Sequence, residues 1–411
     1  MTARYEENTM YLSRFGVKNY KCLGEIDIPL TPIHVLIGEN DAGKTSLLEA
    51  MAAFFGSSEG PLREAFPQPW SGLELVRHGS GDRLVEFWGK WGPCRDEQKA
   101  TPASGFRHGF AVDFPPEGKN CTVADEWIES DGERRVLLPK GGRRDRTALA
   151  NSRQGHEIKG CDPNDLNAIS EVLKPCHMYS FDAKQMALPA AFDTNRKFRL
   201  DPDGFGLATL LDDISGYDPQ RLIELRDTFC DFFPQFKKFR LELEISVKRS
   251  AGPEGIHTSA ITEGKGIFFE TRTGETIRAR HASDGAILFL GFLALAHLPD
   301  PPTLLLIEEP ENGIYPKRLE QVIKMLKELV HRNEGVQLPQ IIMTTHSPYV
   351  LSLFEPEEVT FLSRAPGKPD NPVRARPLRD APNIHNLMKK EEFYLGELWY
   401  NFTEEELFGD A

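Results

Sequence analysis

One stretch decides the fold of this chain: Ile33-His34-Val35-Leu36-Ile37-Gly38-Glu39-Asn40-Asp41-Ala42-Gly43-Lys44-Thr45. Its apolar, partly β-branched start predicts a strand, and the residues from Ser46 to Phe55 predict a helix. Between them stands G-x-x-x-x-G-K-[ST], in the strand–loop–helix context that this motif requires. Gly38 and Gly43 allow a tight turn in which backbone N–H groups point inward at an anion. The stretch therefore predicts a nucleoside triphosphate site.

Side chains of the same loop would complete a phosphate and cation site. Lys44 can reach the β- and γ-phosphates, and the Thr45 hydroxyl can bind Mg²⁺. The N-terminus of the following helix favours negative charge. The nucleotide contacts predicted in the loop are Gly38, Asn40, Asp41, Ala42, Gly43, Lys44, Thr45 and Ser46.

Composition indicates a chain with a sizeable core and an acidic balance. Of 411 residues 40% are apolar, and the formal net charge is −13. No apolar run approaches the ~20 residues of a membrane helix, and the polar, acidic N-terminus does not resemble a signal peptide. The six cysteines form no C-x-x-C pair, which favours reduced thiols over a zinc site or a disulfide framework. We expect a cytoplasmic protein with no membrane contact, and nucleic acid only at a local basic patch.

The first 265 residues predict a β lobe followed by an inserted subdomain. Residues 1–56 contain two alternating segments before the phosphate-loop strand and the loop itself. Residues 57–265 are interrupted by Gly, Pro and Ser and predict a mixture of strands and helices. Strands are expected at 10–17, 25–30, 84–88, 109–114, 134–138 and 239–247, and helices at 207–211 and 219–233.

Residues 266–365 continue with strands that alternate with helices. After a hairpin at 266–278, we expect helices at 286–298 and 316–332 and buried strands at 303–307 and 340–345. Apolar strands that end in polar residues predict a doubly wound sheet whose ligand lies at the carboxyl edge. Residues 366–411 would form a tail on this core. The predicted class is therefore α/β: a mixed sheet flanked by helices, an N-terminal antiparallel β portion and an inserted α+β region.

Three side chains at the ends of the later strands suit triphosphate hydrolysis. Glu308 and Glu309 follow a buried strand, where such a site needs acidic groups for Mg²⁺ and for the attacking water. We assign Glu308 to the metal and Glu309 to the water. His346 ends the next strand, where a neutral imidazole can hydrogen-bond the γ-phosphate. Ser283-Asp284-Gly285 opens a helix about 20 residues before the acidic strand and forms a second N-terminus suited to an anion. Taken alone, such a triplet is more often an ordinary N-cap, and its position before the acidic strand is what favours an anion site.

The order of these motifs resembles the ABC-type ATPase heads, and within them the RecF/SMC-like and OLD (overcoming lysogenization defect) ATPases. The shared features are the phosphate loop, a Ser-x-Gly signature, Glu-Glu-Pro-Glu-Asn-Gly and Thr-His-Ser-Pro. The nearest likeness is to free-standing ATPases of bacteria and phage-defence islands, without a Toprim domain. The resemblance implies a P-loop fold, ATP and Mg²⁺ as cofactors, and Lys44, Glu309 and His346 as catalytic groups. It also implies that Ser283 and Gly285 contact the nucleotide of a second subunit, although this signature departs from the Leu-Ser-Gly-Gly-Gln of transporters.

The resemblance further implies a nucleotide-dependent homodimer that acts as a switch, with a separate effector such as a nuclease as its target. A RecF-like DNA-binding ATPase is the alternative, with Lys237, Lys238, Arg240, Lys248 and Arg249 as a local basic patch. A nuclease in its own right is a third reading. It is disfavoured because only 65 residues follow His346 and they contain no D-x-D pair.

Overall fold

The computed structural model describes most of the chain as two compact units. Residues Met1–Met178, Pro302–Leu306 and Val330–Ala411 belong to the first unit, and Tyr179–Pro301 and Ile307–Leu329 to the second. The described residues are 10–66, 72–93, 105–115, 121–130, 132–137, 144–155, 163–174, 176–192, 197–252, 255–299, 302–330, 340–364, 371–384, 387–388, 394–401 and 403–409.

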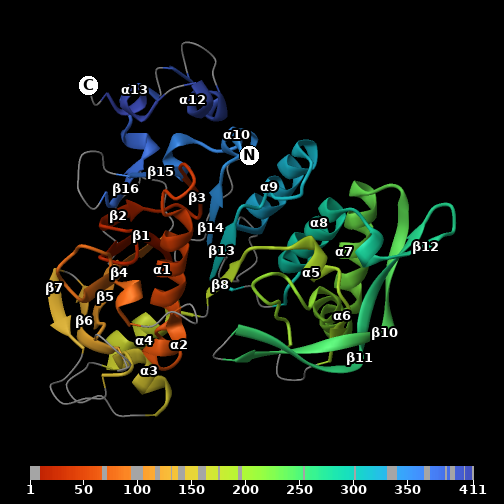
Figure 1. Cartoon of the computed structure of the whole chain (residues 1–411), viewed down its shortest axis with the longest axis horizontal. Coiled ribbons are helices and arrows are strands. Elements are labelled where there is room, and N and C mark those ends of the chain that lie inside the picture. The colour runs from red at the N-terminus through yellow and green to blue at the C-terminus, as the bar shows by residue number, and fades with distance from the viewer. Residues whose placement is uncertain are drawn as a thin grey trace. The chain divides into compact units, whose positions relative to one another are not determined.

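An antiparallel sheet occupies the N-terminal part of the first unit, in the strand order β2-β1-β4-β5-β6-β7 (Figure 1). Its inner face packs on α1 through stacked aromatic rings, such as Phe54 on Phe110 at 5.6 Å between centroids. Such pairs add to the free energy gained by burying apolar area. The elements are β1 (Met10–Lys18), β2 (Glu25–Pro29), α1 (Lys44–Gly56), α2 (Leu62–Ala65), β4 (Leu84–Pro93), β5 (Phe106–Asp113), β6 (Thr122–Ser130), β7 (Glu133–Val136), α3 (Ala148–Arg153) and α4 (Pro163–Val172).

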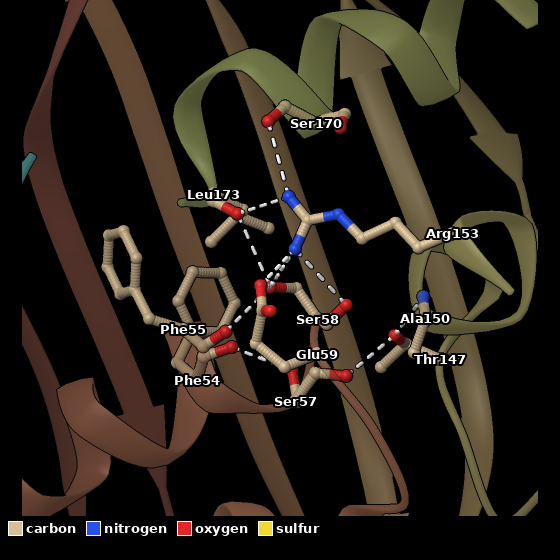
Figure 2. Close-up of polar contacts among 10 residues, drawn as sticks. All are labelled: Phe54, Phe55, Ser57, Ser58, Glu59, Thr147, Ala150, Arg153, Ser170 and Leu173. Atoms are coloured by element: carbon tan, nitrogen blue, oxygen red, sulfur yellow. Dashed lines mark hydrogen bonds and ion pairs between the residues drawn. The ribbon is translucent and has the colours of Figure 1, made fainter. Parts of the chain in front are cut away.

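The C-terminal end of α1 is tied to the inserted helices by one arginine (Figure 2). Arg153 donates to the Ser58 carbonyl at 3.3 Å, to the Leu173 carbonyl at 2.7 Å, and to the Glu59 carboxylate. A cation near the last carbonyls of a helix is favourable because these groups lack intrahelical partners. Thr147 adds a hydrogen bond to the Ser57 carbonyl at 2.9 Å. The helix that follows the phosphate loop is thus anchored at its far end.

A second sheet of six strands carries the loop, in the order β16-β15-β3-β14-β13-β8. β3 lies between β14 and β15, is parallel to both, and is fully buried. A strand with parallel neighbours and both faces covered reads as a continuous apolar run, as Ile33 to Ile37 does. The elements are β3 (Ile33–Ile37), β8 (Cys176–Tyr179), β13 (Leu304–Glu308), β14 (Gln340–Thr345), α10 (Pro348–Leu351), β15 (Val359–Arg364), β16 (Val373–Pro377), α12 (Leu395–Asn401) and α13 (Glu404–Phe408).

The second unit packs helices on a long β-hairpin around phenylalanine rings. Phe229 of α7 stacks on Phe269 of β11 at 5.4 Å, and Phe232 meets Phe289 of α8 at 4.5 Å. α8 is buried along its whole length from Ala286, which explains its nearly all-apolar sequence. The elements are α5 (Ala183–Met186), β9 (Ala190–Ala191), α6 (Leu207–Tyr217), α7 (Pro219–Phe232), β10 (Phe236–Gly252), β11 (Gly255–Thr271), β12 (Thr276–Arg278), α8 (Asp284–Ala296) and α9 (Pro316–Val330).

The predicted α/β class is confirmed, and the expected strands and helices form close to their predicted positions. The features that were not anticipated include the strands β6, β8, β15 and β16, and the pairing of β10 with β11 along 17-residue strands. The outer part of that hairpin exposes Leu243 and Ile245, which alternation alone had placed on a half-buried strand. The four-part division at residues 56, 265 and 365 stays a prediction. No helix among the described residues combines the length and hydropathy needed to cross a bilayer.

Candidate nucleotide-binding site

The phosphate loop has the backbone geometry that its glycines predict. Gly43 has φ +85° and Asp41 φ +62°, both in the left-handed region that a tight anion-binding turn uses. A Cβ on Gly38 would lie 2.4 Å from the Leu362 carbonyl oxygen, so only glycine fits between β3 and β15 there. The loop therefore depends on close contact with β15 as well as on its own sequence.

Lys44 lies against the loop that precedes it. Its Nζ donates to the Gly38 carbonyl at 3.0 Å and to the Glu39 carbonyl at 2.9 Å, and the residue is 6% exposed. This ammonium group stands at the N-terminus of α1, where backbone N–H groups already favour an anion. Thr45 is exposed, so its hydroxyl can face a ligand. The roles of Lys44 in phosphate binding and of Thr45 in cation binding stay predictions.

His346 follows β14, which is the direct neighbour of the phosphate-loop strand. The register pairs Thr345 with Ile37, so the two strands end side by side at the same edge of the sheet. The Thr345 hydroxyl accepts a hydrogen bond from the Ser347 backbone N–H at 3.0 Å and fixes the turn on either side of the histidine. His346 itself is exposed. The first unit thus brings the loop and the predicted γ-phosphate contact together.

The acidic pair lies at the end of β13, and its second member has an unusual backbone. Glu309 has φ +45°, a left-handed conformation that costs an ordinary residue free energy and that occurs in tight turns and at functional sites. Asn312 donates from Nδ2 to Glu309 Oε2 at 2.8 Å. Both glutamates are half-buried. The resemblance had placed Asn312 in a loop, Pro310 to Ile314, expected at a dimer interface, but its bond to Glu309 was not predicted, because local pattern does not reveal the turn that it closes.

The signature residues occupy the N-terminus of α8 in the second unit. Ser283 is the N-cap residue, yet its side chain makes no capping hydrogen bond and the residue is exposed. The ordinary explanation of a serine at this position is therefore not supported. A Cβ on Gly285 would lie 3.3 Å from the Gly313 carbonyl oxygen, so the turn after Glu309 packs on this helix start. The second unit brings Ser283, Gly285 and the residues after Glu309 together.

The donor set suits Mg²⁺ held partly by phosphate. Among the described residues, no group of three or more His, Cys, Asp or Glu side chains gathers to hold a metal ion alone. Mg²⁺ characteristically takes one or two protein oxygens together with phosphate oxygens and water. The Thr45 hydroxyl and the Glu308 carboxylate carry oxygen atoms of that kind, and their role as metal ligands stays a prediction.

The proposed basic patch is largely neutralised where its side chains are described. Lys237 and Lys238 both pair with Glu270, at 3.2 and 3.4 Å, and the two ammonium groups lower the pKa of that carboxyl. Arg240 pairs with Glu242 at 3.2 Å. The side chains of Lys248 and Arg249 lie outside the described residues. Paired cations release fewer counterions on binding DNA, so this surface gives the DNA-binding alternative little support.

Two family models match the chain. One, described as "AAA ATPase domain", covers residues 10–89, which contain the phosphate loop. The other, described as "AAA domain, putative AbiEii toxin, Type IV TA system", covers residues 184–352, which contain Ser283, Glu309 and His346.

Similarity to individual proteins is of two kinds. An OLD nuclease from Thermus scotoductus is 39% identical over 67 residues, which is 16% of this chain and 13% of that protein. An SMC head bound to the C-winged helix domain of ScpA has a TM-score of 0.50 at 16% identity, over 89% of this chain and 97% of that chain. An SMC head with an extended coiled coil, derived from Pyrococcus furiosus, has a TM-score of 0.48 at 14% identity, over 93% and 100%.

The fold and the loop geometry define a P-loop NTPase of the ABC-head type, and the SMC head at TM-score 0.50 has the same architecture. Within that class, the two AAA matches and the short match to an OLD nuclease make the chain similar to ABC/SMC-like AAA ATPases of the OLD-like type.

Proposed function

We propose that the chain binds ATP with Mg²⁺ at the phosphate loop and hydrolyses it in a site shared by two copies. The observation that supports this proposal is the position of Lys44 at the start of α1, where its Nζ donates hydrogen bonds to the carbonyls of Gly38 and Glu39. A buried ammonium group at the N-terminus of a helix suits a polyphosphate, because both carry positive charge. The similarity of the chain to AAA ATPase family models supports ATP hydrolysis as the reaction.

Each predicted residue has a defined task in this reaction. Backbone N–H groups from Gly38 to Ser46 and the Lys44 ammonium would hold the phosphates and offset charge that develops on the γ-phosphate. Thr45 and Glu308 would hold Mg²⁺, which supplies further charge neutralisation when bound. Glu309, oriented by Asn312, would take a proton from the attacking water. The imidazole of His346 would hydrogen-bond the γ-phosphate.

The second copy would supply Ser283 and Gly285. The Ser283 hydroxyl makes no bond to its own helix, and α8 presents an N-terminus that favours an anion. Binding of ATP would then join two copies, and hydrolysis would separate them, because the γ-phosphate is the group that both copies contact. The resulting homodimer would act as a switch.

The switch would regulate a separate effector, such as a nuclease, in phage defence or DNA metabolism. This part rests on the partial likeness to an OLD nuclease. The RecF-like alternative predicts DNA affinity that falls steeply with salt, and filter binding across a salt series tests it directly. A nuclease activity of the chain itself has weaker support, because no acidic cluster suited to a metal occurs among the described residues.

Hydrolysis and mass measurements on wild type and Glu309→Gln test the proposal. We expect turnover to fall by roughly 100-fold or more, because the amide cannot take the proton. ATP should then hold the variant as a dimer, while ADP leaves it monomeric. Normal turnover by the variant would show that Glu309 does not have the assigned role, and absence of ATP binding by the wild type would remove the proposal altogether.

A further inference from the structure

The C-terminal segment, residues 394–401 and 403–408, contacts the helix that follows His346. Within α12, a Cβ on Gly396 would lie 2.0 Å from the Pro348 carbonyl oxygen and 2.5 Å from Ser352 Oγ. Pro348 begins α10 and is two residues beyond His346. The contact is between backbones, and no side chain can be added at Gly396 without moving one of the two helices.

The same segment is fixed to the end of β15. Trp399 packs edge-on against Phe361, with the ring centroids 5.0 Å apart. Glu404 accepts hydrogen bonds from Ser363 Oγ at 3.1 Å and from Arg374 Nη2 at 2.6 Å. These contacts hold α12 and α13 against a strand that is the direct neighbour of β3.

Between the segment and the phosphate loop lies a cavity of about 470 Å³. Its lining includes Glu39 and Asn40 of the loop and Trp399, Thr403 and Glu404 of the segment. Figure 1 shows α12 and α13 beside β15 and β16, at the same end of the unit as α10. One short segment thus contacts the turn after His346 and shares a cavity with the start of the loop.

We propose that the C-terminal segment is a positioning element for hydrolysis, with Gly396 as its key residue. The inference rests on the proposed function, since it concerns the step in which His346 meets the γ-phosphate. α12 would hold Pro348, and through it the turn that carries His346, in the reactive position. Because Trp399 shares the cavity with Glu39 and Asn40, a change in the loop on ATP binding would alter its surroundings. The segment would thereby couple occupancy of the loop to the placement of His346.

Gly396→Ala tests this inference, with Gly216→Ala as the matched control. Gly216 lies in α6, and an added Cβ there would meet nothing within 4 Å. We expect Gly396→Ala to lower kcat roughly 10- to 100-fold, since a displacement near 1 Å has such effects. KM and ATP affinity should change less than about 2-fold, because the loop contacts remain. The control should match the wild type in both parameters.

Two further results decide the inference independently of that variant. ATP should change the tryptophan emission of the wild type, and Trp399→Phe should abolish the change while leaving the ATP-binding isotherm intact. An emission change that persists in Trp399→Phe, or a folded Gly396→Ala with normal kcat, would overturn the inference. Failure of the wild type to bind or hydrolyse ATP would instead overturn the proposed function, so the two failures are distinguishable.

Discussion

The phosphate loop and the signature differ in how completely their own unit builds them. In the first unit, Lys44 is buried and bonded to two loop carbonyls, and Gly38 is pressed against β15. In the second unit, Ser283 is exposed and its hydroxyl caps nothing. The loop is complete within one chain, whereas the signature is presented outward. Under the proposed function, affinity for the nucleotide would reside in the loop, and the signature would act on a second copy of the chain.

The largest expected loss of stability comes from a substitution at Gly38, where the loop packs closely on β15. Gly38→Ala should lower the free energy of unfolding by roughly 2 to 4 kcal/mol and abolish ATP binding, because a backbone carbonyl occupies the place of the new Cβ. Gly81→Ala is the control: Gly81 also has a positive φ, +71°, but has open space around it. Gly81→Ala should lower the free energy of unfolding by about 1 kcal/mol. Urea unfolding and ATP titration measure both, and equal effects of the two variants would show that close packing on β15 is unimportant.

The strand that carries the loop should respond to acid. His34 is fully buried on β3 between the hydroxyls of Thr31 and Thr360, at 3.0 and 2.9 Å. Burial, with a smaller effect of Arg379, lowers the pKa of His34 to about 3. Below about pH 6.5 the unfolded chain therefore binds a proton at His34, whereas the folded chain does not bind it until about pH 3. The free energy of unfolding therefore falls as the pH falls from about 6.5 to about 3.

The expected loss from this histidine between pH 6.5 and pH 5 is about 2 kcal/mol. His34→Gln removes the titrating group, and its stability should vary correspondingly less with pH over the same range. Chemical unfolding at a series of pH values measures the slopes. Parallel slopes for variant and wild type would mean that other groups account for the acid sensitivity.

The smallest effect on stability is expected at the signature. Ser283→Ala should cost less than about 0.5 kcal/mol, because no capping bond is lost, and yet it should strongly reduce hydrolysis. Thr147→Ala is the comparison, since Thr147 caps α3 by accepting from the Ala150 N–H at 3.2 Å and also binds the Ser57 carbonyl. That variant should cost about 1 to 2 kcal/mol. A large stability loss in Ser283→Ala would restore the ordinary N-cap interpretation.

The phosphate loop and its flanking elements could be predicted from the sequence, because the residues that form them are close together in the chain. The apolar run of β3, the two loop glycines and Lys44 fall within a dozen residues, and the structure has the predicted strand, turn and helix there. The strand ends at Glu308 and His346 were found for the same reason.

Other features depend on contacts between distant residues, which leave no local pattern. Gly396 matters because of Pro348, and Gly38 because of Leu362, in addition to its place in the motif. The β10–β11 hairpin escaped prediction because the residues from Gly255 to Gly264 lack a regular apolar period. The exposure of Leu243 could not be foreseen, since alternation shows which face a residue shares but not how far the helices cover that face.

The most direct test of a site shared by two copies is a mixing experiment with Lys44→Ala and Ser283→Arg. Each variant alone should be inactive, one lacking the phosphate contact and the other the signature. In a mixed dimer one site would combine an intact loop with an intact signature. An equimolar mixture should therefore recover roughly a quarter of the wild-type ATPase rate, as random pairing in a two-fold dimer predicts. A mixture no more active than the sum of its parts would contradict the account.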